Sequence, residues 1–189
     1  LTEIVAQVGG RVPVTAAWGE LAEALPLEQT EREALRGVRL VKFGTARLQN
    51  ELAVWSSRWR AIRESLPPEI AIAVVHYADW HCAEALNLEA TLAKAEEMQA
   101  GALVIDTWAK GEASLLDFYG PAELTEIVQR TRARRMEVVL AGSLRLPHFE
   151  RVSECGSSVI GVRGAACRDG EREGTICRER VANLKRVLD

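Results

Sequence analysis

The sequence has 189 residues, of which 48% are hydrophobic, and a formal net charge of -3. This length can bury one sizeable core, so a single domain over residues 1–189 is the simplest organisation. The weakly acidic balance offers no basic field for nucleic acid or an anionic membrane surface, whereas small anionic metabolites remain open as partners. No apolar run reaches the roughly 18 residues of a membrane span and no signal peptide opens the chain, so a soluble cytoplasmic protein is expected.

Two residue types stand out by their number. The four cysteines, Cys82, Cys155, Cys167 and Cys177, form no C-x-x-C pair and are interpreted as reduced thiols. Zinc sites usually draw ligands in close sequence pairs, so no metal site is predicted. Of the 24 cationic side chains only four are lysines, namely Lys42, Lys94, Lys110 and Lys185. Each lysine therefore needs an explanation.

Six short apolar runs rich in β-branched residues are expected to be strands: residues 12–17, 38–43, 70–77, 102–107, 138–141 and 159–162. Helical periodicity lies between them. One apolar face is formed by Leu48, Leu52, Trp55, Trp59, Ile62 and Leu66, and Pro121 suits a first helical position. Gly37 and Gly101 precede strands, where a helix is expected to end in a left-handed cap.

Strands that alternate with helices and are apolar at consecutive positions predict a parallel sheet buried on both faces. An open doubly wound sheet usually carries a Gly-rich turn after its first strand, and this sequence does not. Polar residues instead end most of the strands: Glu20, Lys42, Asp79, Asp106, Ser143 and Arg163. Such a ring is typical of an α/β fold of the (β/α)8 TIM-barrel type, whose C-terminal mouth carries the chemistry.

Six strand-helix units are fewer than the eight of such a barrel. Eight units would need about 250 residues, the usual size of this fold. The sequence ends on an amphipathic pattern of Val181, Leu184 and Leu188, so we expect the chain to hold the last six units. The first two units are expected to be absent, and residues 1–9 would then form the end of the helix after the second strand.

Lys42 ends the second apolar run. If it points inward, alternation places it above Leu40 and Val38 in the barrel interior, where desolvation would lower the pKa of its ammonium group. An amine of this kind can accept a proton or form a Schiff base. The alternative is a lysine at a strand end whose ammonium reaches bulk water.

The fourth strand ends on Asp106, and Lys110 follows four residues later. Among other cations, Asp106 would be held ionised and could orient a lysine or transfer protons. A simpler interpretation is that Asp106 only caps the turn that follows. Because lysine is scarce and Lys110 falls in the same loop, catalytic roles for Asp106 and Lys110 are favoured.

Two small-residue turns end the last two strands, at Gly142-Ser143 and at Arg163-Gly164. In barrels these two loops form the common phosphate site, where small residues let backbone N–H groups approach the ligand. Arg163 could add a bidentate contact. Either turn alone is compatible with a simple tight turn, but together they predict phosphate binding.

Other residues carry weaker indications. Trp18, Trp80 and Trp108 follow strand ends and either roof the mouth or pack against neighbouring loops. His76 either faces the site or is a hydrogen-bonded structural histidine. Four arginines, Arg130, Arg132, Arg134 and Arg135, end a helix and are interpreted as a solvated face rather than a nucleic-acid patch.

Several of these motifs together resemble one family, the (5-formylfuran-3-yl)methyl phosphate synthases, which make the furan precursor of methanofuran. The resemblance runs from about Arg11 onward and rests on the segments 42–44, 77–79, 106–118, 141–143 and 161–167. It implies a barrel lyase that condenses two molecules of glyceraldehyde 3-phosphate and then eliminates phosphate and water. It implies no metal or organic cofactor, and a small phosphorylated substrate.

The resemblance also implies roles for individual residues. Lys42 matches a proton-accepting lysine, Asp106 a carboxylate that assists proton transfer, and Lys110 a nearby lysine. Gly142, Ser143, Arg163 and Gly164 are expected to hold phosphate. Tyr77 and Asp79 are expected in the wall of the site.

One feature of the family has no counterpart here. Its Schiff-base lysine follows an aspartate at the end of the second strand, and this sequence has no such segment. Three alternatives follow: the furan phosphate lyase, another Schiff-base aldolase-type enzyme acting on a phosphorylated aldehyde or ketose, and a non-catalytic relative that binds phosphate ligands. A homo-oligomer is expected if a partner copy fills the gap by domain exchange.

Overall fold

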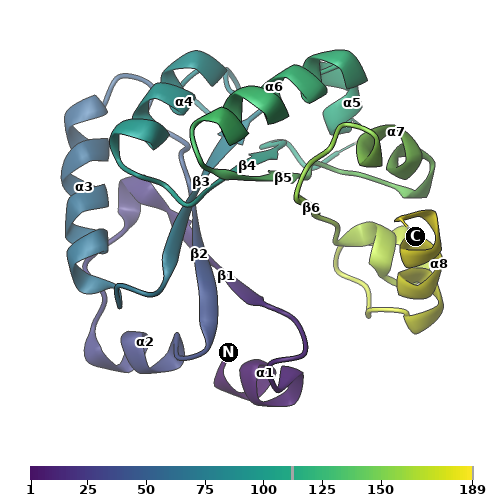
Figure 1. The fold of residues 1–189 in the computed structure, drawn as a ribbon, viewed down its shortest axis with the longest axis horizontal. Helices are drawn as coiled ribbons and strands as arrows, with labels where there is room; N and C mark the ends of the chain where they lie inside the picture. Colours follow the sequence, from purple (N-terminus) through teal and green to yellow (C-terminus); the bar gives the residue numbers. More distant parts are fainter. Residues whose placement is uncertain (112, 189) are drawn as a thin grey trace.

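Six parallel strands form one curved sheet in a computed structural model that describes residues 1–111 and 113–188 (Figure 1). The strands pair in chain order, each with the next. Their bounds are β1 Val14–Glu20, β2 Val38–Gly44, β3 Ala71–Tyr77, β4 Ala102–Asp106, β5 Glu137–Leu140 and β6 Val159–Ile160. All six predicted strands are therefore confirmed, with small shifts at their ends.

The helices cover the outer, convex side of the sheet and leave the arc open between β1 and β6 (Figure 1). They are α1 Thr2–Val8, α2 Gln29–Ala34, α3 Leu52–Ser65, α4 Leu88–Glu97, α5 Leu115–Phe118, α6 Pro121–Ala133, α7 Phe149–Ser153 and α8 Arg178–Leu188. Short 3-10 turns are η1 Leu21–Glu23, η2 Leu146–His148, η3 Gly164–Ala166 and η4 Arg168–Gly170. The architecture is thus a partial α/β barrel of six strand-helix units. In the part of the chain described, no helix has the length and apolarity that crossing a bilayer requires.

Side chains of the central strands alternate between two cores, as a pleated sheet requires. On β3, Ile72 and Val74 belong to the outer core beneath the helices, whereas Ala73 and Val75 belong to the inner core. On β4, Leu103 and Ile105 are outer and Val104 is inner. Asp106 follows Val104 by two positions and Lys42 follows the inner Leu40 by two, so both point toward the barrel interior.

An irregularity in β2 corrects one expectation. Val14 pairs with Val38, but Thr15 pairs with Leu40, so β2 has one extra residue at Arg39. A bulge of this kind breaks the alternation of faces. Val38 consequently packs in the outer core and does not lie beneath Lys42, while Leu40 does lie in the inner core.

The predicted helices form with two local differences. In α3, Trp55, Trp59 and Ile62 are buried as expected, but Leu52 in the first turn is half exposed. Gly37 has a left-handed φ of 82°, as predicted for a cap, whereas after α4 the left-handed position is Gln99 and not Gly101. Gly101 instead permits close approach, since a Cβ there would lie 2.8 Å from the Cβ of Ala71.

Candidate active site

A cavity of about 520 Å³ lies at the C-terminal ends of the strands. Its two sides differ in composition. We call one side the lysine wall, lined by Ala17, Lys42, Asp106, Lys110 and Gly111, and the other the loop wall, lined by residues 141–145, 161–165 and 170–172. Both sets of residues predicted for chemistry and for phosphate binding therefore line the same cavity.

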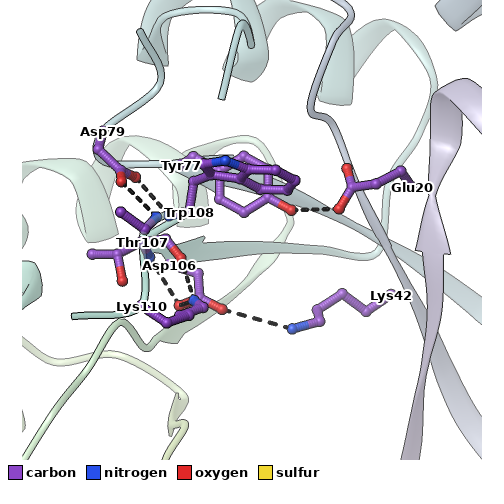
Figure 2. A network of polar contacts seen from close by, with 9 residues as sticks. Glu20, Lys42, Tyr77, Asp79, Asp106, Thr107, Trp108 and Lys110 are labelled. Carbon is purple, nitrogen blue, oxygen red and sulfur yellow. Dashed lines mark hydrogen bonds and ion pairs between the residues drawn. The ribbon is translucent and has the colours of Figure 1, made fainter. Parts of the chain in front are cut away.

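Asp106 lies between the two lysines of the lysine wall (Figure 2). Its Oδ1 accepts a hydrogen bond from Lys110 Nζ at 2.8 Å, and its Oδ2 lies 3.9 Å from Lys42 Nζ. Lys110 also donates to the backbone carbonyl of Thr107. Two ammonium groups thus share one carboxylate, an arrangement in which protons can pass between neighbouring groups.

The structure also bears on the alternative roles of these residues. Asp106 Oδ1 accepts from the backbone N–H of Thr107 at 2.8 Å, so Asp106 caps the turn as well as pairing with lysine. The Lys42 and Lys110 side chains each keep 32% of their surface exposed, against 16% for Asp106. Lys42 therefore faces the cavity while retaining contact with solvent.

The loop after β5 brings backbone close to the lysine wall. Gly142 and Ser143 both have positive φ, 108° and 49°, so their peptide groups turn sharply at the strand end. A Cβ on Gly142 would lie 3.0 Å from both the Cγ2 and the backbone nitrogen of Thr107. Only glycine fits this contact without displacing the segment that carries Asp106 and Lys110.

The loop after β6 is covered by a later segment. A Cβ on Gly164 would lie 2.7 Å from the carbonyl oxygen of Gly170, so residues 170–172 lie directly against it. The Arg163 guanidinium donates through Nε to the carbonyl of Arg172 at 2.9 Å and lies 3.9 Å from the Glu173 carboxylate. Arg163 is 59% exposed, so it lines the cavity while also holding this segment.

Two further arginines, which the sequence motifs did not indicate, also line the loop wall. Arg145 follows the Gly142-Ser143 turn, a sequence proximity that would have indicated it. Arg172 arrives through the segment beyond η4, and no local pattern marks it. With Arg163 they add three positive charges to the loop wall, against one negative charge from Glu171, so the wall is net positive, which favours an anionic ligand.

Tyr77 belongs to a buried group behind the lysine wall. Its hydroxyl donates to Glu20 Oε1 at 2.8 Å (Figure 2). Glu20 Oε2 accepts from the Ala46 N–H at 2.8 Å. Gly44 makes room for this carboxylate, because a Cβ there would lie 2.1 Å from Glu20 Oε1. Burial, reinforced by Glu20, raises the pKa of Tyr77 well above its usual range, so Tyr77 stays a hydrogen-bond donor.

Asp79 also lies behind the cavity. Its carboxylate accepts hydrogen bonds from the backbone N–H groups of Trp108 and Ala109, at 2.6 and 2.8 Å. Neither Tyr77 nor Asp79 is among the described residues that line the cavity. Both support the lysine wall instead of forming its surface.

The remaining candidates occupy structural positions. His76 is fully buried beneath the outer side of β3, where Nε2 lies 2.8 Å from the Tyr119 hydroxyl. Burial lowers the pKa of His76 to about 4. Trp108 contacts Tyr77 edge-on with ring centroids 5.3 Å apart, and Trp80 stacks on His81. Within the described chain, none of the three tryptophans considered lines the cavity.

The arginine cluster at the end of α6 is partly engaged. Arg130 pairs with Glu89 and Arg134 with Glu96, both on α4, whereas Arg132 and Arg135 are exposed. The interpretation as a purely solvated face therefore holds for only two of the four arginines. These ion pairs join the neighbouring helices α4 and α6 on the outer layer, and none of the four arginines lines the cavity in the part of the chain that the structure describes.

The fold and the cavity together define a class: an α/β barrel protein with lysine and carboxylate side chains facing glycine-rich turns at the strand ends. A family model described as 4-HFC-P synthase matches residues 1–185. The chain therefore belongs to the 4-HFC-P synthase family, which confirms the resemblance noted in the sequence.

Individual relatives agree with this assignment. The chain is 33% identical over 147 residues to the (5-formylfuran-3-yl)methyl phosphate synthase of Methanopyrus kandleri, covering 77% of the chain and 62% of that protein. It is 29% identical over 153 residues to the synthase of the same name from Methanothermobacter thermautotrophicus, covering 80% and 64%. The matches thus span slightly less than two thirds of these relatives.

Solved structures support the fold. The structure of 3-hexulose-6-phosphate synthase from Salmonella typhimurium superimposes with a TM-score of 0.59 at 17% sequence identity, over 98% of this chain and 78% of the other. At this identity the likeness concerns architecture alone. It agrees with a partial α/β barrel.

Proposed function

We propose that this chain carries the proton-transfer and phosphate-binding parts of a lyase that condenses two molecules of glyceraldehyde 3-phosphate into a furan aldehyde phosphate, with loss of phosphate and water. The observation that carries the proposal is the cavity itself. It sets Lys42, Asp106 and Lys110 opposite the two glycine turns. Membership of the family and the printed names of the relatives support the product class.

Each wall supplies a part of this chemistry. Forming a carbon-carbon bond next to a carbonyl requires removal of a proton, and Lys42 is the proposed acceptor. Asp106 pairs with both ammonium groups and would assist the transfer, with Lys110 beside it. The loop wall would bind the substrate phosphate, because it combines backbone N–H donors with positive charge. The donors are the N–H groups of Gly142, Ser143 and Gly164, and the charge is that of the Arg163 guanidinium.

The carbonyl chemistry of the family reaction also uses a Schiff-base lysine. This sequence has no aspartate followed two residues later by lysine, the pattern that marks that residue in the family. A second candidate function is the binding of a phosphorylated ligand without turnover, which the glycine turns and arginines of the loop wall favour by themselves. The two candidates share the loop wall and differ in whether covalent chemistry follows.

One experiment distinguishes these functions. The purified chain is incubated with glyceraldehyde 3-phosphate while inorganic phosphate and near-ultraviolet absorbance are followed. The lyase predicts that phosphate release and a furan chromophore appear together, and that Lys42→Met abolishes both. Calorimetric binding of the substrate with no product, even at high protein concentration, would instead identify the ligand-binding function. An adduct trapped by borohydride with the mass of another carbonyl compound would indicate a different aldolase-type reaction.

A further inference from the structure

The end of β4 and the turn that follows it carry two of the three polar groups of the lysine wall. Asp106 ends the strand, and Lys110 lies four residues on, beyond the exposed residues Trp108 and Ala109. Lys110 contacts this same segment, through Asp106 and the Thr107 carbonyl. The position of the Lys110 amine therefore depends on what holds residues 107–110 in this turn.

Asp79, in the turn after β3, is the residue that holds them from one side. Its two carboxylate oxygens bind the Trp108 and Ala109 N–H groups separately, at 2.6 and 2.8 Å (Figure 2). In the described chain these N–H groups have no other acceptor. Asp79 is only 7% exposed, so water competes little for the two hydrogen bonds.

The turn that carries Asp79 is itself well anchored. The Asp79 carbonyl accepts from the N–H of Cys82 at 2.8 Å and from that of Ala83 at 3.3 Å. The adjacent Ala78 N–H donates to the Asp106 carbonyl at 2.8 Å. The carboxylate thus projects from a fixed backbone onto an otherwise exposed loop.

Thr107 fixes the same segment on its opposite side. Its side chain is fully buried, and its backbone and methyl group lie against Gly142 of the loop wall. The loop is therefore held between Asp79 and Gly142. Of these two contacts, only the one from Asp79 involves charge and direct hydrogen bonds to the exposed part of the loop.

We propose that Asp79 is a positioning residue that sets the Lys110 amine against Asp106 by binding the Trp108 and Ala109 backbone. A carboxylate suits this role because both of its oxygens accept hydrogen bonds, whereas an asparagine side chain presents one oxygen and one N–H2 group. Its importance for catalysis rests on the proposed function, but the positioning itself can be measured without turnover.

The test uses Asp79→Asn, which preserves side-chain volume and removes one acceptor. Native protein is acylated with a limiting amount of acetic anhydride, digested, and the modification of each lysine is measured by mass spectrometry. Lys185 is exposed on α8 and serves as the internal reference. We expect the acetylation of Lys110 relative to Lys185 to rise about tenfold, because one charge-assisted hydrogen bond is lost. The acetylation of Lys42 relative to Lys185 should change little.

Asp117→Asn is the matched control. Asp117 lies in the same connection between β4 and α6 and also caps a backbone, through the N–H and hydroxyl of Ser114, both 2.7 Å from its Oδ2. In the described part of the chain Asp117 makes no hydrogen bond to Trp108 or Ala109, so its substitution should leave Lys110 labelling unchanged. Equal rises in both variants, or a parallel rise at Lys42, would show general loosening and overturn the proposal.

A measurement on the unmodified protein guards against a variant that fails to fold. Amide hydrogen exchange resolved by NMR should show the Trp108 and Ala109 N–H groups protected to a similar degree as the Ala78 N–H, although both residues are exposed. Exchange at the rate of free loop amides would also overturn the proposal. If turnover is present, Asp79→Asn should lower kcat about tenfold with little change in KM. Absent turnover in the unmodified chain would count against the proposed function while leaving the labelling result intact.

Discussion

The two walls of the cavity are built in different ways. The lysine wall holds its charged groups through side-chain contacts: Asp106 pairs with the partly exposed Lys42 and Lys110, and the buried Asp79 and Tyr77 lie behind. The loop wall consists of glycine turns with exposed arginines, and one N–H of Arg163 donates a hydrogen bond to the backbone carbonyl of Arg172. The geometry of the lysine wall is therefore preorganised by side chains, whereas that of the loop wall is set by backbone.

This difference suits two kinds of task. Proton transfer requires donor and acceptor within hydrogen-bond reach, so small displacements are costly. Anion binding tolerates looser geometry, because charge acts over a longer distance and several N–H groups share the contact. Substitutions should therefore have large effects on turnover at the lysine wall and moderate effects on affinity at the loop wall.

The largest effect is expected from Asp106→Asn. The substitution removes the charge shared by both lysines and should lower kcat of the proposed reaction by about 100-fold or more. Binding of inorganic phosphate, measured by calorimetry, should be unchanged or tighter, because the cavity becomes more positive. An equal loss of binding and turnover would show that the two walls do not have separate roles.

The next effect concerns pH and the support of β3. Burial holds the pKa of His76 at about 4, against about 6.5 in an unfolded chain, so the unfolded state binds more protons between these values. Stability should therefore fall as the pH is lowered from about 6.5 to about 4, by about 3 kcal/mol. Urea unfolding of His76→Gln should show a flatter pH dependence in this window. His81→Gln, at an exposed histidine, should retain the slope of the unmodified protein.

A smaller effect is expected from Gly44→Ala. The new methyl group would overlap the Glu20 carboxylate and force it away from Tyr77 and the Ala46 N–H. We expect a loss of about 1–3 kcal/mol in the free energy of unfolding. Gly120→Ala, where a Cβ meets nothing within 4 Å, should cost much less. If both variants lose similar free energies of unfolding, Glu20 does not support the lysine wall.

The smallest effects separate the arginines of the loop wall. Arg172→Ala should weaken phosphate binding by about tenfold or less, since it removes one exposed charge. Arg163→Ala should weaken it somewhat more, because Arg163 also holds the segment that carries Arg172. Titration at two salt concentrations should show weaker salt dependence in both variants. A stronger effect on kcat than on affinity would contradict the division between the walls.

Much of the fold and part of the site could be predicted from the sequence. The six strands follow from apolar runs, and parallel strands end on one side of a barrel, so Lys42, Asp106, Ser143 and Arg163 could be assigned to one mouth before their distances were known. Strand alternation also placed Lys42 and Leu40 on the same face. Periodicity alone could not reveal the extra residue at Arg39 that turns Val38 outward.

The contacts that support the two walls could not be predicted from local sequence patterns. Asp79 was noted at a strand end, but its partners Trp108 and Ala109 follow the next strand, and the choice between site wall and support depends on side-chain direction. Arg172 could not be assigned because its position depends on a close packing of Gly164 against Gly170. Both cases require tertiary contacts between segments that have no sequence periodicity in common.

The packing of Gly170 on Gly164 determines when the cavity forms during folding. Lys42 and Arg172 face the same space although most of the chain separates them, so the cavity closes only after the segment around residue 170 has docked. Ligand affinity is then a reporter of completed folding. A single proteolytic cut between Cys167 and Arg172 should leave the lysine pair around Asp106 in place and yet free Arg172 from the cavity. A bound phosphate compound should protect that bond from the protease.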